Sequence, residues 1–230
     1  MSRVCRRIFL GRPEGRLLQV EYAFETVNRG ATIIGITCSE GAILGAEEPE
    51  EKLADMSTSR KIFEIDEHIG AAVVGLASDA NILVEQARLI AQNDRLLYDE
   101  PIDVELLSKR ISDIKQMYTQ YAGVRPFGVL MIFTGIDKTG KKIFVTDPSG
   151  SYRAFKAVAI GIGREIIEET LKKEYKETLK IKKAIDLVIK CLAASMQSRD
   201  ETAAMRIAVV PSKTRRFRFL SKEEISTIKL

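Results

Sequence analysis

The chain passes twice through the same order of elements, and this order limits the folds open to it. In each half, four short apolar runs are joined in pairs by turns of a few residues, and two helical stretches follow. Strands joined by such short turns pair antiparallel, because a parallel pair needs a crossover of about a dozen residues or more. We predict strands at 31–38, 42–46, 61–66, 69–75, 127–137, 141–147, 151–155 and 156–161, and helices at 78–99, 102–121, 164–178 and 181–198.

Several predicted strands are apolar on both faces, which indicates how the sheets are covered. The run IGAAVVG at 69–75 has no polar face to turn toward water. Such a strand belongs in a sheet that is covered on both sides. We therefore expect a four-layer α/β/β/α sandwich of two antiparallel sheets, an α/β (α+β) fold over 31–230 whose last elements are strands at 202–210 and 214–220 and a short helix at 221–227.

An extra N-terminal helix is predicted before the first strand. Four apolar residues recur at i, i+3, i+7 and i+10, as on one face of a helix; they are Leu17, Val20, Phe24 and Val27. Arg29 and Gly30 follow, as a helix end prefers. We expect a leading helix at 17–29 and an irregular basic arm at 1–14, all within one domain of 1–230.

Composition excludes several classes of protein. The net charge is only +4, from 36 basic and 32 acidic residues, which does not indicate a nucleic-acid partner. The three cysteines are far apart, so we expect no disulfide framework, metal site or cofactor. No apolar run reaches the ~18 residues of a membrane span, and residues 8–10 are too short an apolar run for a secretory signal. A cytoplasmic protein without a membrane partner is expected.

The usual catalytic patterns are missing or have simpler explanations. The single histidine, His68, falls in a predicted hairpin turn, where a solvated side chain is the simplest interpretation. The glycines of GIGRE at 161–165 suit a strand-to-helix turn better than a dinucleotide-binding loop. We expect Glu47 and Glu48 in a solvated acidic loop. Arg125, in the segment RPFG, either tethers its loop or contacts a partner.

Two longer stretches are more specific. They are PEGRLLQVEYA at 13–23 and QMYTQYAGVRPFGV at 116–129, and the turn DPSG follows at 147–150. In this order, over nearly the whole chain, they resemble the α-type subunits of the proteasome core particle in an archaeal-like form. The resemblance implies a non-catalytic member of the N-terminal nucleophile hydrolase superfamily. Its fold would be the same four-layer sandwich with a leading helix.

The resemblance further implies a set of partners. Neighbouring α-subunits would complete a seven-membered outer ring, and this ring would template the ring of proteasome β-subunits. A regulatory ATPase activator would dock on it, and unfolded protein substrates would enter through its pore. These partners fit a role in protein degradation rather than a free-standing enzyme.

Comparison of the first strand with that of the catalytic β-type subunits bears on catalysis. In that family a threonine begins the first strand, and its free amine serves as the base. The matching residue is Ala31, which has no hydroxyl. Thr32 is one position off, so its side chain would point to the opposite face, and its nitrogen is an amide. Lys61 matches the catalytic lysine but has no nucleophile to assist, so we expect no peptidase activity.

Lys61 has a second role implied by the resemblance. In the family, a lysine just before this strand lines a pocket between neighbouring α-subunits. It pairs there with the C-terminal carboxylate of an activator tail, as a point-charge ammonium can. Gly15, Glu21 and Gly30 match other positions of this tail pocket. Phe24 departs from the family pattern, which commonly has arginine at that position.

The gate of the pore is where the sequence departs most. The family has a Tyr-Asp-Arg box in the arm, and the aligned residues are Val4, Cys5 and Arg6. The turn proline and helix tyrosine with which the box bonds are kept, as Pro13 and Tyr22. Valine cannot donate a hydrogen bond and cysteine is a weak donor. We therefore predict a pore that is leaky or closed differently.

Two other functions stay open at the level of sequence. One is an active β-type peptidase with an N-terminal threonine, which Ala31 and the retained leading helix disfavour. The other is a non-proteasomal homo-oligomer of the same superfamily, for which the changed gate leaves room. The native mass of the chain with and without a β-subunit would separate these readings.

Overall fold

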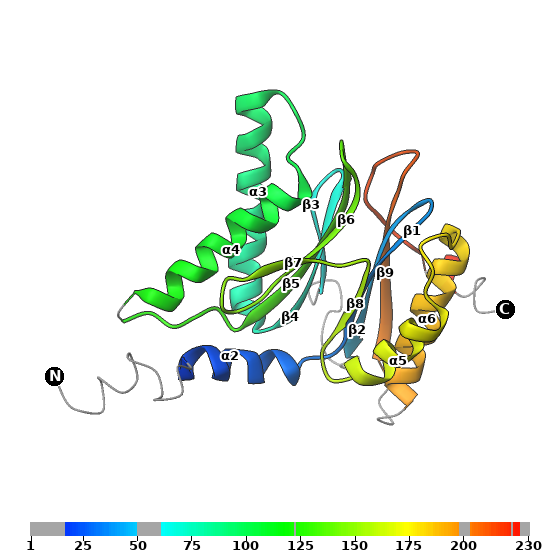
Figure 1. The fold of residues 1–230 in the computed structure, drawn as a ribbon, viewed down its shortest axis with the longest axis horizontal. Coiled ribbons are helices and arrows are strands. Elements are labelled where there is room, and N and C mark those ends of the chain that lie inside the picture. The colour runs from blue at the N-terminus through cyan, green and yellow to red at the C-terminus, as the bar shows by residue number, and fades with distance from the viewer. Residues whose placement is uncertain (1–16, 50–60, 122, 198–202, 222, 226–230) are drawn as a thin grey trace.

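A computed structural model of the chain consists of two five-stranded antiparallel sheets packed face to face, each covered by a pair of helices on its outer side (Figure 1). The structure describes residues 17–49, 61–121, 123–197, 203–221 and 223–225. The expected four-layer α/β/β/α sandwich is therefore confirmed.

The first sheet has the strand order β10-β9-β2-β1-β8. The two central strands form the predicted hairpin, in which Ile36 pairs with Ile43. The sheet brings together segments that lie far apart in the sequence, because β9 pairs along the full length of β2. Its strands are β1 (Ile33–Cys38), β2 (Gly41–Pro49), β8 (Ala157–Ile160), β9 (Ala203–Pro211) and β10 (Arg218–Phe219).

The second sheet follows the chain order, β3-β4-β5-β6-β7. Its central strand β5 is buried along its whole length, as expected for a strand covered on both faces. The β5–β6 hairpin turns at Lys138–Thr139, where Asp137 accepts hydrogen bonds from the amide and hydroxyl of Thr139. The strands are β3 (Ile62–Asp66), β4 (Ile69–Gly75), β5 (Val129–Asp137), β6 (Gly140–Thr146) and β7 (Tyr152–Ala154).

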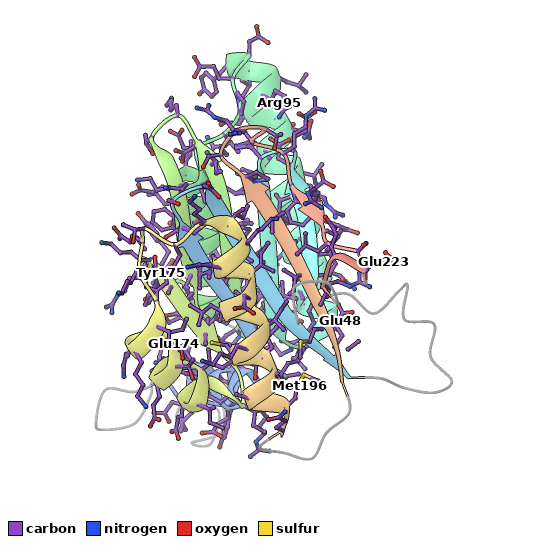
Figure 2. The ribbon with its side chains drawn as sticks, turned by 90° about the vertical axis from the view of Figure 1, so that its right-hand side faces the viewer. Glu48, Arg95, Glu174, Tyr175, Met196 and Glu223 are labelled. Carbon is purple, nitrogen blue, oxygen red and sulfur yellow. The ribbon has the colours of Figure 1, made fainter. Side chains whose placement is uncertain are left out.

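Three apolar clusters correspond to the three interfaces between the four layers. One lies between the sheets and includes Leu44 and Ile132. A second joins the second sheet to helices α3 (Ala77–Tyr98) and α4 (Val104–Gln120). The third joins the first sheet to α5 (Arg164–Glu174) and α6 (Ile181–Gln197), which Figure 2 shows from the helix side.

The leading helix α2 (Leu18–Asn28) lies across one end of the sandwich, at the bottom of Figure 1. Val27 on its last turn is fully buried in the cluster between the sheets. A glycine is required directly after the helix, because a Cβ on Gly30 would lie 2.3 Å from Val74 Cγ2. The predicted helix at 17–29 is thus confirmed to within a residue at each end.

Several predicted elements differ from the structure, among them the helix predicted at 164–178, which ends at Glu174. Of the expected strand at 214–220, only Arg218–Phe219 pairs with β9, because the preceding residues form a turn in which Arg215 has φ 50°. The helix predicted to start at residue 78 begins one residue earlier, since α3 starts at Ala77. The nearby carboxylate of Asp79 bonds across to another loop.

Candidate functional site

The strongest sequence-based site lies where the chain passes from α2 into β1. Lys61, directly before β3, donates a hydrogen bond from Nζ to the carbonyl oxygen of Ala31 at 2.9 Å. The backbone of Lys61 is also fixed, since its carbonyl accepts from the Val73 amide at 2.9 Å. The residue aligned with a catalytic lysine therefore lies beside the residue aligned with the nucleophile.

Two buried carboxylates flank this pair. Glu47 Oε2 accepts from the Thr32 amide at 3.2 Å, and Glu48 Oε1 accepts from the Lys61 amide at 3.1 Å. Glu48, labelled in Figure 2, also forms an ion pair from Oε2 to Arg206 Nε at 3.1 Å. The expectation of a solvated loop for Glu47 and Glu48 is wrong. Strand β2 continues through both residues and pairs there with β9, and both side chains are buried.

The turn at 161–163 closes over the same place. Gly161 has φ 115°, which favours glycine, and the Ile162 amide donates to the Gly30 carbonyl at 3.0 Å. The Gly163 amide donates to Thr32 Oγ1 at 3.0 Å. A Cβ on Gly163 would lie 1.7 Å from Ser195 Oγ, so no larger residue fits without rearrangement. The strand-to-helix turn predicted for these glycines is confirmed, since α5 starts at Arg164.

This arrangement lacks the groups that an N-terminal nucleophile needs. The chain is continuous from α2, so the nitrogen of Ala31 is an amide and has no basic lone pair. The hydroxyl of the next residue, Thr32, is fully buried and lies 3.4 Å from Ser195 Oγ in addition to its bond from Gly163. Lys61 has a carbonyl oxygen as its neighbour where a hydroxyl would be required.

The other predicted site residues are only partly brought together. Gly30 lies beside Lys61, whereas Glu21 and Tyr22 lie more than two turns earlier on α2. Tyr22 is 63% exposed, and Glu21 is half-buried. Phe24 lines an apolar groove of about 390 Å³ between α2, β8 and α5. Gly15, Pro13, Arg6, Val4 and Cys5 lie outside the described residues.

Arg125 tethers its loop, which is one of the two roles that the sequence left open for it. Its guanidinium donates to both carboxylate oxygens of Asp79, at 2.6 and 2.7 Å. Asp79 Oδ2 also accepts from the Gly128 amide at 2.9 Å. Burial alone would raise the pKa of Asp79, but these bonds and the Arg125 charge hold it below its ordinary value. The start of α3 is thereby fixed to the loop that leads into β5.

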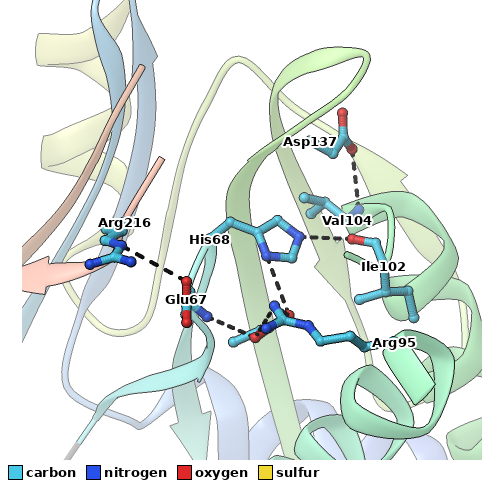
Figure 3. Close-up of polar contacts among 8 residues, drawn as sticks. Glu67, His68, Arg95, Ile102, Val104, Asp137 and Arg216 are labelled. Atoms are coloured by element: carbon cyan, nitrogen blue, oxygen red, sulfur yellow. Dashed lines mark hydrogen bonds and ion pairs between the residues drawn. The ribbon is translucent and has the colours of Figure 1, made fainter. Parts of the chain in front are cut away.

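A polar cluster at the other end of the sandwich was not anticipated. His68 is buried, so the prediction of a solvated side chain is wrong. Figure 3 shows its Nε2 facing the Ile102 carbonyl at 2.8 Å, and its Nδ1 lies 3.3 Å from Asp66 Oδ2. Arg95 donates to both oxygens of Asp66, at 2.8 and 2.9 Å. The segment between α3 and α4 covers the turn, which no local pattern around His68 could indicate.

Lys115 on α4 is a second buried polar group that sequence reasoning missed. Its side chain is fully buried, and Nζ donates to Val129 O, Thr146 O and Thr146 Oγ1 at 3.1, 3.0 and 2.8 Å. A signal was present, because position 115 continues the i, i+4 spacing of the buried Leu107 and Ile111. The contacts join α4 to the beginning of β5 and the end of β6.

Comparison with known proteins identifies the family. The family model described as "Proteasome subunit" matches residues 27–210. Three relatives named "Proteasome subunit alpha" are similar over most of their length. The one from Archaeoglobus fulgidus is 46% identical over 221 residues, which cover 96% of this chain and 89% of the relative. The one from Methanocaldococcus jannaschii is 44% identical over 225 residues, with 97% and 85% covered.

The chain belongs to the proteasome subunit family. The third relative, from Saccharolobus islandicus, is 42% identical over 216 residues and also has the α-subunit name. The chain therefore groups with the α-type subunits of the proteasome core, as its motifs indicated. Among the described residues, no helix is long and apolar enough to cross a membrane, and no group of side chains is suited to hold a metal ion.

Proposed function

We propose that this chain is the structural and gating α-subunit of a proteasome core particle and has no peptidase activity of its own. It forms the outer seven-membered ring, templates the β-subunit ring, admits unfolded protein substrates and docks the tails of an activator ATPase. The observation on which this proposal rests is Ala31, which stands beside Lys61 at the position of the nucleophile. The α-type names of the relatives support it.

The absence of catalysis follows from three features of the same place. Ala31 supplies no hydroxyl, its nitrogen is acylated by Gly30, and the buried Thr32 hydroxyl accepts from the Gly163 amide. Processing of the chain between Gly30 and Ala31 would free an amine but still no nucleophile. The active β-type alternative therefore requires a chemistry that these residues do not supply.

Activator docking is proposed at Lys61, with Gly15, Glu21 and Gly30 as further parts of the tail pocket. An ammonium has three N–H groups, and the bond to Ala31 O holds Nζ beside the segment that connects α2 to β1. A terminal carboxylate arriving there would meet a positive charge that is already positioned. Arg6, Pro13 and Tyr22 are proposed to belong to the gate, with Tyr22 already exposed on α2.

Co-expression with a threonine-bearing β-subunit tests the proposal. We expect a four-ring particle by native mass spectrometry, with this chain at its full length by intact mass. A particle whose β-subunit lacks the threonine hydroxyl should hydrolyse no peptide. The control is the same particle with an intact β-subunit, which should be active. A free N-terminus at Ala31 or Thr32, or residual hydrolysis, would contradict the non-catalytic role, and failure to assemble with any β-subunit would favour the homo-oligomer.

A further inference from the structure

Four turns that are distant in the sequence meet around the β1–β2 turn, at the upper right of Figure 1. The Ser39 amide and hydroxyl both donate to the Leu179 carbonyl, in the loop between α5 and α6, at 2.9 and 2.8 Å. The Ser212 amide, in the β9–β10 turn, donates to the Glu40 carbonyl at 2.7 Å. Lys141, after the β5–β6 turn, donates from Nζ to the Ser39 carbonyl at 3.1 Å.

These turns concentrate basic side chains at this end of the sandwich. We call the set the basic turn cluster. It includes Lys156, whose carbonyl accepts from the Thr37 amide at 2.8 Å. All members are exposed: Lys141, Lys156, Lys176, Lys180, Lys182, Lys183, Lys213 and Arg215.

Two carboxylates of these turns, Glu40 and Glu177, are already engaged. Glu177 forms an ion pair with Lys156, and Glu40 Oε2 accepts from the Ile181 amide at 3.0 Å. Within the described part of the chain, the other basic side chains of the cluster form no ion pair with a carboxylate. The cluster therefore presents uncompensated positive charge to its surroundings.

The eight members of the cluster and its two carboxylates together have a higher formal charge than the entire chain. Eight basic and two acidic residues give the turns a formal charge of +6, whereas the whole chain has +4, so all other residues together sum to −2. The near-balanced total conceals a segregated surface. Such a surface raises the local concentration of oppositely charged partners and steers their approach.

We propose that the basic turn cluster is a docking surface for an acidic segment of a partner protein. Seven of its eight members are lysines, and each exposed ammonium group can pair with a single carboxylate of such a segment. A segment with clustered Glu and Asp has the charge that complements the cluster.

This surface is separate from the place proposed for activator tails. Lys61 lies beside Ala31, at the end of the sandwich crossed by α2, whereas the basic turn cluster lies at the far end of β1 (Figure 1). Loss of either contact can therefore be measured without the other. The inference does not depend on the proposed function.

The test is binding of a fluorescent oligoglutamate peptide to the full chain, followed by anisotropy at low and physiological salt. The variant Lys180→Glu/Lys213→Glu reverses two charges whose side chains form no hydrogen bond or ion pair with other described residues. A glutamate near the start of α6 favours the helix dipole, so weaker binding could not be ascribed to loss of this helix. We expect affinity to fall about tenfold, which corresponds to about 1.4 kcal/mol, and to fall with added salt in the wild type.

The matched control is Lys109→Glu/Arg88→Glu, which makes the same change of net charge on α4 and α3, the helices that cover the other sheet. Its peptide affinity should stay within about twofold of the wild type, a difference of roughly 0.4 kcal/mol. Equal losses in both variants, or no peptide binding at all, would overturn the proposal. Tighter cluster-dependent binding of duplex DNA or of phosphatidylserine vesicles than of oligoglutamate would overturn it as well, in favour of another polyanion.

Discussion

Lys115 has the most unusual environment of any single charged residue described. Burial lowers its pKa from 10.5 to about 7, and the charge of Asp147 opposes this shift. In the unfolded chain the amine keeps its ordinary pKa and stays protonated up to about pH 10. Between pH 7 and 10 the unfolded state therefore binds more protons than the folded state, so the free energy of unfolding rises with pH.

We predict that Lys115→Met removes this pH dependence. The wild type should gain at most about 1.4 kcal/mol in unfolding free energy per pH unit above pH 7, and the variant should lack this share of the slope. Urea unfolding at several pH values from 7 to 9.5 measures the difference. Lys172→Met, on the exposed side of α5, is the control and should keep the wild-type slope. Parallel curves for all three proteins would show that Lys115 titrates normally.

Lys61 is the residue on which activator docking can be tested. Lys61→Ala should abolish ATPase-stimulated protein degradation by a reconstituted particle, because no other charge in the proposal meets the tail carboxylate. Hydrolysis of small peptides without the ATPase should stay unchanged. The lost bond to Ala31 O costs only about 1 kcal/mol, too little to prevent assembly. Stimulation equal to that of the wild type would remove Lys61 from the tail pocket; Lys172→Ala serves as the control.

The residues predicted well from sequence are those whose role depends on neighbours in the chain or on a family motif. Ala31 follows a continuous helix, and Arg125 lies in a proline-stiffened loop that needs a tether. Glu48 and His68 were misjudged because their partners, Arg206 and Ile102, come from segments far along the chain. A local acidic or hairpin pattern does not reveal that another strand or loop will cover it.

At the scale of elements, hairpins were predictable and their assembly was not. The pairing of β1 with β2 follows from a two-residue turn, Ser39–Glu40, between apolar runs. The pairing of β2 with β9 joins strands more than a hundred residues apart, and it converts the expected acidic loop at 47–48 into buried strand. The pairing of β9 with β2 in the first sheet therefore depends on contacts between distant segments, which form only in the folded chain.

The clamp between Asp79 and Arg125 connects the helix α3 to the loop before β5. We predict that Arg125→Met lowers the free energy of unfolding at pH 7 by about 2 kcal/mol, because it leaves a buried carboxylate with fewer donors. The pKa of Asp79 should rise without the guanidinium. Since a lowered folded-state pKa stabilises at neutral pH and this gain is lost on acidification, the variant should show a weaker loss of stability toward acid.

Urea unfolding between pH 3 and 7 measures both effects. Arg153→Met, an exposed arginine on β7, is the control for charge alone and should change stability by less than about 0.5 kcal/mol. Asp79→Asn keeps an acceptor for the Gly128 amide, so a double-mutant cycle with Arg125→Met isolates the ion pair. Additive effects of the two changes would mean that the pair contributes nothing beyond its separate groups.

At the scale of the whole molecule, the two ends of the sandwich have different chemistry. One end contains α2, Lys61 and the inert start of β1, where entry and activator docking are proposed. The other presents the basic turn cluster, whose charge exceeds that of the entire chain. On these proposals, an α-type subunit offers two separate contact surfaces at opposite ends of one sandwich.

The gate gives the last prediction at this scale. The family box would hold the arms through a tyrosine hydroxyl and an aspartate, and Val4 and Cys5 stand in their places. Deletion of residues 1–9 should therefore raise the peptide hydrolysis of the assembled particle only slightly, because in the proposed gate Val4 and Cys5 would let the intact arm close the pore poorly. The measurement is hydrolysis of a short fluorogenic peptide by the particle without activator.

Restoring the box provides the matched comparison. Val4→Tyr/Cys5→Asp gives the arm a hydroxyl donor and a charged acceptor, which Pro13 and Tyr22 of the family pattern would meet. If the missing hydroxyl and carboxylate are the cause, the stimulation of peptide hydrolysis by added activator ATPase should differ between this variant and the unmodified particle. After deletion of the arm, the activity of the β-subunits themselves should be the same in both. A severalfold rise in hydrolysis when residues 1–9 are removed from the unmodified chain would instead show that Val4, Cys5 and Arg6 already form a working plug.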